Sequence, residues 1–120
     1  MAQTVTKASG VPTQWLKWTG EITIPKGTDI VMNATHLGAA PELERVPIDW
    51  QSVNKNMTVV DVITNPRVTP FLLTARELGC PIVDGVEMLV QLAMQMFEDW
   101  TGVKPDETVF QKSVAQALGE

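Results

Sequence analysis

The sequence predicts an α/β fold, a partial Rossmann-like parallel sheet of about three to four strands with helices on both faces. Three apolar runs carry this prediction, residues 29 to 34, 57 to 63 and 80 to 84, and each ends in small or polar residues. Buried parallel strands read as continuous β-branched runs, and ligands of such sheets bind just beyond the carboxyl ends of the strands. Residues 33 to 35, 64 to 66 and 84 to 85 are therefore expected to line one crevice.

The part of the chain before the second strand contains fewer regular elements. Residues 1 to 10 are predicted to form the end of a helix that stops at Gly10, and residues 13 to 18 alternate well enough to predict a short strand. Residues 36 to 56 contain Gly38 and two prolines, so they read as a long loop with one helical turn near residues 49 to 53. Loops of this length beside a ligand crevice are often functional.

The second half reads as a βαβ unit followed by two helices. Thr69 is a natural N-cap and Pro70 suits a first helical position, so a helix is predicted from there to Leu78, with Gly79 as its stop. The short strand that follows closes a unit that should cross over right-handed.

Two predicted helices complete the chain. Asp84 can cap the first of them, and Gly102 ends it. We expect this helix to be long and mostly buried, because its apolar residues recur at three- and four-residue spacing: Val86, Leu89, Leu92, Ala93, Met96, Phe97 and Trp100. Asp106 can cap a final amphipathic helix, whose apolar face holds Phe110, Val114, Ala117 and Leu118.

Length and composition exclude several classes of function. The 120 residues allow a single domain, residues 1 to 120, and the net charge of −5 without a Lys/Arg cluster argues against nucleic acid or an anionic membrane as partner. One cysteine and one histidine cannot build a closed zinc site, so no metal is expected. No apolar run approaches 18 residues and the N-terminus lacks the apolar core of a signal peptide, so we expect a cytoplasmic protein.

Three segments resemble the cofactor domain of the shikimate/quinate dehydrogenase family. Residues 33 to 38 reproduce an Asn-Ala-Thr-x-x-Gly loop that in this family follows the fourth strand. Residues 61 to 66, with Thr69-Pro70, resemble the family's segment after the fifth strand. Residues 84 to 92 resemble its most characteristic segment, Asp-Gly-x-Gly-Met-Leu-x-x-Gln. The resemblance covers most of this chain but only about half of such an enzyme.

The resemblance implies NAD or NADP as the cofactor of the parent family. The implied cofactor-binding residues are Asn33, Thr35, His36, Val62, Ile63, Asn65 and Gly85. Several of them have a simpler local explanation. Asn and Thr after a strand commonly satisfy backbone groups in a turn, His36 can be a solvated surface side chain, and Gly85 can serve a tight turn between strand and helix.

Departures from the family pattern concern the substrate. Thr64 stands where the family usually has a Tyr of the substrate pocket, and Glu87 replaces the second glycine. The position of the substrate-binding Gln holds Leu92, while Gln91 lies one residue earlier and about 100° away on the helix. Thr64 and Gln91 are therefore weak candidates for substrate binding. Without the family's glutamine amide at the position of Leu92, a polyol substrate would lose hydrogen bonds worth about 0.5 to 1.5 kcal/mol each.

Catalytic groups of the family have no counterpart in these 120 residues. The sequence contains no Gly-x-Gly-x-x-Gly loop and no substrate domain with its Lys/Asp pair, so no catalytic residue is assigned. Two hypotheses follow. The chain is a C-terminal fragment of a shikimate/quinate dehydrogenase-like oxidoreductase, inactive in isolation, or it is a stand-alone, non-catalytic, self-associating α/β module derived from that family.

The expected partner is a second copy of the chain. The apolar strand at residues 29 to 34 would pair with a first Rossmann strand that the 120 residues do not contain, and no proline or charge between Asp29 and Asn33 discourages another strand from binding there. We therefore expect a homodimer or a higher even oligomer.

Overall fold

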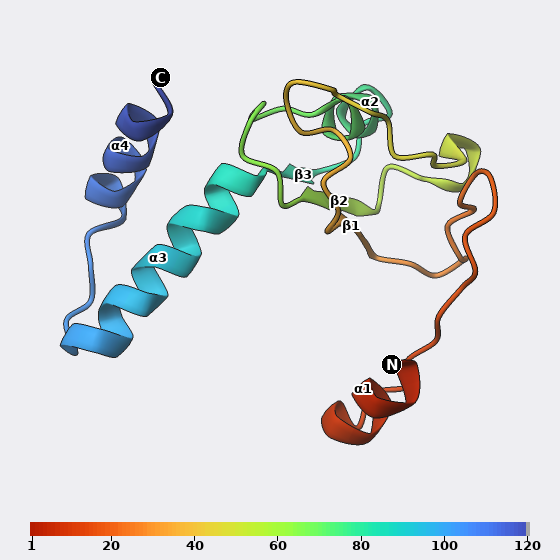
Figure 1. The fold of residues 1–120 in the computed structure, drawn as a ribbon, viewed down its shortest axis with the longest axis horizontal. Coiled ribbons are helices and arrows are strands. Elements are labelled where there is room, and N and C mark those ends of the chain that lie inside the picture. Colours follow the sequence, from red (N-terminus) through yellow and green to blue (C-terminus); the bar gives the residue numbers. More distant parts are fainter. Residues whose placement is uncertain (120) are drawn as a thin grey trace.

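The computed structural model describes residues 1–119 and has an α/β architecture (Figure 1). Its elements follow the order α1 (Ala2–Ser9), β1 (Ile30–Asn33), η1 (Trp50–Ser52), β2 (Thr58–Asp61), α2 (Pro70–Glu77), β3 (Ile82–Val83), α3 (Gly85–Thr101) and α4 (Glu107–Leu118). The predicted partial Rossmann-like fold is confirmed, as are the helical turn within the long loop and the helix that ends at Gly10.

The strands within residues 1–119 form a parallel sheet of order β1-β2-β3. Val31 lies opposite Val59 and Asn33 opposite Asp61, while Val59 lies opposite Ile82. Because all three strands are parallel, their carboxyl ends meet at one edge, where the loops toward residues 34, 62 and 84 begin. The sheet therefore gathers the three predicted site segments at one place.

The hydrophobic core lies between the sheet and α2. Val59 on β2 and Leu72 on α2 are completely buried, and Trp50 of η1 packs against Phe71 with ring centroids 5.5 Å apart. Cys80 lies in the same cluster, and burial raises the pKa of its thiol. This core holds β2 and β3 rigidly against α2, so the loops that leave them start from fixed positions.

Helix capping follows the sequence closely. The side chains of Thr69, Asp84 and Asp106 each accept a hydrogen bond from a backbone N–H in the first turn of α2, α3 and α4. Gly10 and Gly102 end α1 and α3 with φ of 71° and 69°, in the left-handed region that glycine adopts without strain. The hydrogen bonds from Thr108 to the Asp106 carboxylate lower the pKa of that carboxyl.

The predicted strand at residues 13 to 18 is wrong. These residues take no regular structure, and Trp15 and Trp18 are 72% and 48% exposed. Their alternating pattern is that of a strand, but a strand also needs a neighbour to pair with. No strand of the described sheet offers one there, since β1 pairs only with β2.

The prediction that the long helix is mostly buried is also wrong. Along α3 only Gly85, Val86 and Val90 are buried, whereas Leu92 is 54% and Trp100 77% exposed. In Figure 1 the helix runs away from the sheet with only α4 beside it. The apolar periodicity was recognised correctly, but within residues 1–119 nothing covers the rest of this helix surface.

The two faces of the sheet also differ in how far helices cover them. Helices were predicted on both faces, and α2 covers the face that carries Val59. Side chains alternate along a strand, so Ile30 and Met32 point to the opposite face, where they remain 62% and 54% exposed. Among the described helices, none is long and apolar enough to cross a membrane.

Candidate functional site

The three predicted site segments converge beyond the carboxyl ends of the strands. The backbone N–H of Ala40 donates to the carbonyl of Asn65 at 3.0 Å, which ties the loop after β1 to the loop after β2. Gly38, in the loop after β1, has a φ of 101° and faces the side chains of Thr69 and Ile63. Gly85 at the start of α3 packs directly on the backbone of Val62 and Ile63. The structure thus brings together the segments expected to line one crevice.

A buried carboxylate holds this edge together. Asp61 at the end of β2 is completely buried, and its Oδ1 accepts hydrogen bonds from Asn33 Nδ2 at 3.2 Å and from the N–H of Ile63 at 3.1 Å. Its Oδ2 accepts a hydrogen bond of 2.6 Å from the hydroxyl of Thr69. A buried charge needs such partners, because an unsatisfied one is strongly destabilising. Asp61 therefore joins the exits of β1 and β2 to the first turn of α2.

Thr69 extends the same network into α2. Its hydroxyl donates to Asp61 and accepts a hydrogen bond from the N–H of Leu72, so one side chain serves as both bridge and N-cap. Sequence reasoning identified the cap and missed the bridge. The available signal was an acid inside a β-branched run, Val59 to Ile63, because a charge in a strand buried on both faces must find partners nearby.

Asn33 has a structural role in this arrangement. It is 4% exposed, and its Nδ2 donates to the carbonyl of Leu37 as well as to Asp61. Its Oδ1 accepts hydrogen bonds from the N–H and the hydroxyl of Thr35, at 3.1 and 2.7 Å. These are the bonds of an Asx turn, the local alternative expected for Asn and Thr after a strand.

The neighbouring predicted residues remain open to solvent. Thr35, His36 and Asn65 are exposed, while Thr64 is half-buried. His36 lies at a shallow depression of about 130 Å³ that it lines together with residues 39–42 and Glu44. The imidazole of His36 and the amide of Asn65 are thus presented on the outer side of these loops, whereas the Thr35 hydroxyl donates to Asn33 Oδ1 and accepts from the N–H of Leu37.

Gly85 occupies a position that no other residue fits. A Cβ built there would lie 2.3 Å from the carbonyl oxygen of Ile63 and 2.6 Å from that of Val62. Both neighbours are backbone atoms, which cannot swing away as a flexible side chain can. Gly85 was expected to serve a cofactor contact or a tight turn, and the structure shows that the backbone at the exit of β2 packs against it.

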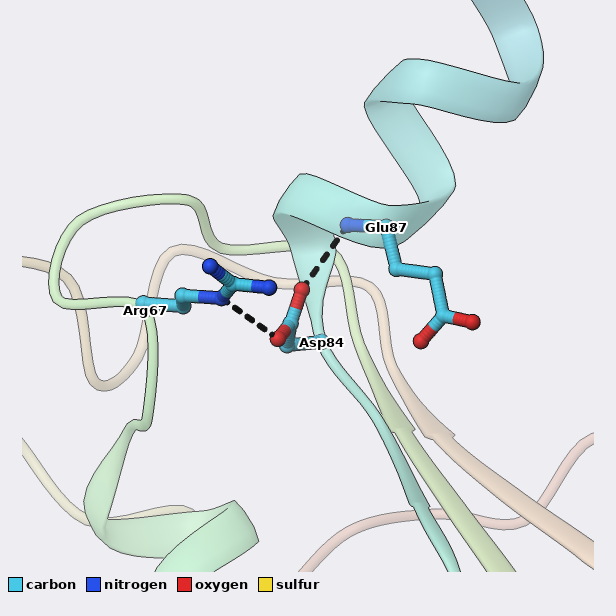
Figure 2. Close-up of polar contacts among 3 residues, drawn as sticks. All are labelled: Arg67, Asp84 and Glu87. Atoms are coloured by element: carbon cyan, nitrogen blue, oxygen red, sulfur yellow. Dashed lines mark hydrogen bonds and ion pairs between the residues drawn. The ribbon is translucent and has the colours of Figure 1, made fainter. Parts of the chain in front are cut away.

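An ion pair joins the loop after β2 to the start of α3 (Figure 2). The Nε of Arg67 donates to Asp84 Oδ2 at 2.9 Å, while Asp84 Oδ1 accepts the N–H of Glu87 at 2.8 Å as the N-cap of α3. In Figure 2 the carboxylate of Glu87 points away from the pair. Arg67 was not among the predicted residues, since an arginine in a loop gives no sign of its partner before the fold is known.

A groove of about 380 Å³ lies between this loop, α3 and α4. Val86, Val90 and Ala115 give it apolar walls, and the polar residues around it are Arg67, Glu87, Gln91, Glu107, Gln111 and Lys112. Gln91 Nε2 donates to Glu107 Oε1 at 3.1 Å, and Gln111 Nε2 donates to the same oxygen at 3.0 Å. The amide of Gln91, a weak candidate for substrate binding, is thus engaged in holding α4 against α3. Within residues 1–119 no cluster of three possible metal ligands occurs.

No family profile matches the chain, but known proteins that are similar to it in sequence share one description. It is 40% identical to the NADP⁺-dependent shikimate dehydrogenase of Methanococcus aeolicus over 91 residues, and 37% identical to that of Archaeoglobus fulgidus over 90 residues. Each match covers 75% of this chain, and 33% and 34% of the respective enzyme. The chain spans about a third of the length of these curated relatives.

Solved structures show the same relationship. The ligand-free structure of the 5-ketofructose reductase of a Gluconobacter strain matches this chain with 33% identity and a TM-score of 0.85. The match covers 97% of this chain and 43% of the reductase chain. A shikimate dehydrogenase in complex with NADP⁺ matches 76% of this chain, with 30% identity and a TM-score of 0.68. The quinate dehydrogenase of Corynebacterium glutamicum in complex with NAD matches 75% of this chain, with 32% identity and a TM-score of 0.67. The resemblance to the shikimate/quinate dehydrogenase family is confirmed.

The contact at Gly85 generates a direct prediction. We expect Gly85→Ala to lower the free energy of unfolding by about 1 to 3 kcal/mol, because the new Cβ must displace the backbone of Ile63. Urea denaturation followed by circular dichroism measures the change. Glu87→Ala, two residues along the same helix and exposed, is the matched control and should shift stability by less than about 0.5 kcal/mol. Equal stability of the two variants would show that the close approach at Gly85 does not exist.

Proposed function

We propose that this chain, which matches about a third of a shikimate dehydrogenase, forms the carboxyl-terminal part of an NAD(P)-dependent oxidoreductase. In that role it would provide one wall of the dinucleotide site. The observation that carries the proposal is the convergence of the loops after β1, β2 and β3, fixed by Asp61 and by the backbone contact at Gly85. Relatives that share this part of the chain have been solved in complex with NADP⁺ and with NAD.

The residues at this edge fit contact with one part of a dinucleotide. Thr35, His36 and Asn65 are exposed beyond the carboxyl ends of parallel strands, where nucleotides bind in such folds. A bound nicotinamide would supply or accept the hydride. The chain's own contribution would be to position it, because the loops beneath these side chains are held by the buried network and cannot shift freely.

We infer that the substrate is a polyhydroxylated ketone or the corresponding alcohol. The chain departs from the shikimate dehydrogenase pattern at Thr64 and Leu92, both expected near the substrate. The 5-ketofructose reductase aligns with 97% of the chain, against 76% for the shikimate dehydrogenase bound to NADP⁺. That enzyme reduces a ketone on a sugar, and its match over nearly the whole chain supports the same substrate class here.

The alternative is a stand-alone, non-catalytic and self-associating module. One observation favours it: Gln91, the nearest amide to the family's substrate-binding position, is bound to Glu107, and Leu92 is apolar. A chain that had lost its substrate contacts would show this pattern.

The isolated 120 residues are expected to be catalytically silent. Without a glycine-rich loop the diphosphate lacks its usual helix N-terminus, so calorimetry should find no affinity for NAD or NADP tighter than roughly the millimolar range, about 4 kcal/mol. Oxidation of shikimate or quinate should stay at background. A micromolar dissociation constant, or turnover that Gly85→Ala abolishes, would contradict this.

A chimera tests the proposed function itself. In the Gluconobacter 5-ketofructose reductase, the region matched by this chain would be replaced by residues 1–120, and oxidation of NADH and NADPH by 5-ketofructose would be followed. We expect activity that the Gly85→Ala chimera loses and the Glu87→Ala chimera keeps. A chimera that folds, as judged by circular dichroism, but oxidises neither cofactor would contradict the proposal.

A further inference from the structure

The groove between α3 and α4 lies on a side of α3 that the proposed function does not use. In Figure 1, α4 runs beside α3, away from the sheet. Gln91 lines the groove, whereas Leu92, at the family's substrate position, lies about 100° away around the helix. Glu87, which also lines the groove, lies about 140° from Leu92. A molecule in the groove would therefore be neither the substrate nor the cofactor.

The floor of this groove is apolar and firmly held. Val86 and Val90 are 4% and 3% exposed, and they line the groove together with Ala115 of α4. Both valines lie in the first two turns of α3, which the N-cap Asp84 and the backbone contact of Gly85 fix in place. The volume of about 380 Å³ falls within the roughly 300 to 1,000 Å³ of small-molecule sites. The groove can thus take a small metabolite and offers it an apolar surface.

Three side chains at the groove form one hydrogen-bonded cluster. Glu107 Oε1 accepts hydrogen bonds from Gln91 Nε2 at 3.1 Å and from Gln111 Nε2 at 3.0 Å. Because a carboxylate can only accept hydrogen bonds, both glutamines must turn their amide nitrogens toward it. Within residues 1–119, Oε2 of Glu107 and the carbonyl oxygens of both amides have no partner. The cluster therefore leaves acceptors from three side chains close to one another at the groove.

The charged residues at the groove leave both signs unpaired. Lys112 of α4 has no ion-pair partner among the described residues, whereas Arg67 is paired with Asp84. The two carboxylates at the groove, Glu87 and Glu107, outnumber this one unpaired cation. The groove therefore attracts a positive group, and Lys112 offers a place for a negative one.

We propose that this groove binds a small zwitterion, an α-amino acid with an apolar side chain. Its ammonium group carries three donors, which matches the free acceptors of Gln91, Glu107 and Gln111. Its carboxylate pairs with Lys112, and its side chain covers the apolar floor. A simple amine fits less well because it leaves Lys112 unpaired, and a polyol leaves both charges uncompensated. The site goes beyond the proposed function, since it serves neither hydride transfer nor the binding of its reactants.

Titration of the 120-residue chain with L-leucine, followed by two-dimensional NMR, tests the proposal. The side-chain amide signals of Gln91 and Gln111 should shift together and saturate, with a dissociation constant of about 1 mM or tighter. The side-chain amide of Gln95, which lies on α3 outside the groove and donates to Asp99, should not shift. The readout is binding and not turnover, so its failure is distinguishable from failure of the proposed function.

Two analogues of leucine each lack one of its charges. 4-Methylpentanoate has no ammonium group, and 3-methylbutylamine has no carboxylate. Both keep the apolar side chain, so the floor of the groove is filled equally well. Each should bind more weakly than leucine by about five-fold or more, because one charged contact is lost.

Variants separate the two charged contacts. Lys112→Gln should weaken binding of leucine by about five-fold or more and leave binding of 3-methylbutylamine unchanged, whereas Glu107→Gln should weaken both. The side chain of Lys112 holds no other part of the described chain, so circular dichroism of Lys112→Gln should match that of the original protein. Lys104→Gln and Glu98→Gln, exposed and outside the groove, are the charge-matched controls and should bind leucine within about two-fold of the original chain.

Two results would overturn the proposal. The first is a dissociation constant for leucine weaker than about 1 mM. The second is equal binding of leucine by Lys112→Gln and Lys104→Gln, which would show that Lys112 pairs with no carboxylate and that the cluster around Glu107 only holds α4 against α3.

Discussion

The hydrogen bonds of the buried Asp61 carboxylate are the constraint on which the candidate site depends. They reach Asn33 at the end of β1, the backbone of Ile63 after β2 and the N-cap Thr69 of α2. One side chain thereby joins the end of β1, 28 residues away in the sequence, to the exit of β2 and the first turn of α2. Since a buried carboxylate tolerates no loss of partners, the segments must stay together for the fold to be stable. The exposed groups at this edge therefore sit on a rigid base.

The local structure could be predicted from the sequence because its causes are local. Thr69, Asp84 and Asp106 cap helices wherever their chain neighbours allow it, and Gly10 and Gly102 end helices by their backbone freedom. The Asp61 network could not be predicted, because its partners depend on strand register and on the path of the loops. Gly85 was expected to serve a tight turn or a cofactor contact, and only the fold shows that the backbone of Ile63 packs against it.

The two errors of sequence reasoning have one physical cause. The apolar pattern of residues 13 to 18 and of the long helix α3 is that of elements with covered faces, and both remain exposed within residues 1–119. Periodicity reports which face a residue is suited to bury, and the partner for that face must exist elsewhere. The chain covers 43% of a related reductase.

Amide hydrogen exchange on an Asp61→Asn variant tests the central role of this carboxylate most directly. The substituted side chain keeps one acceptor oxygen, so its amide nitrogen must face either the donors Asn33 Nδ2 and Ile63 N–H or the Thr69 hydroxyl, and the network loses an acceptor. We expect the amides of Thr35, Ile63 and Leu72 to lose protection together, by at least ten-fold each, because all three belong to the same network. Loss of protection at Ile63 alone, with Thr35 and Leu72 unchanged, would show that the three segments are held independently and would contradict the account.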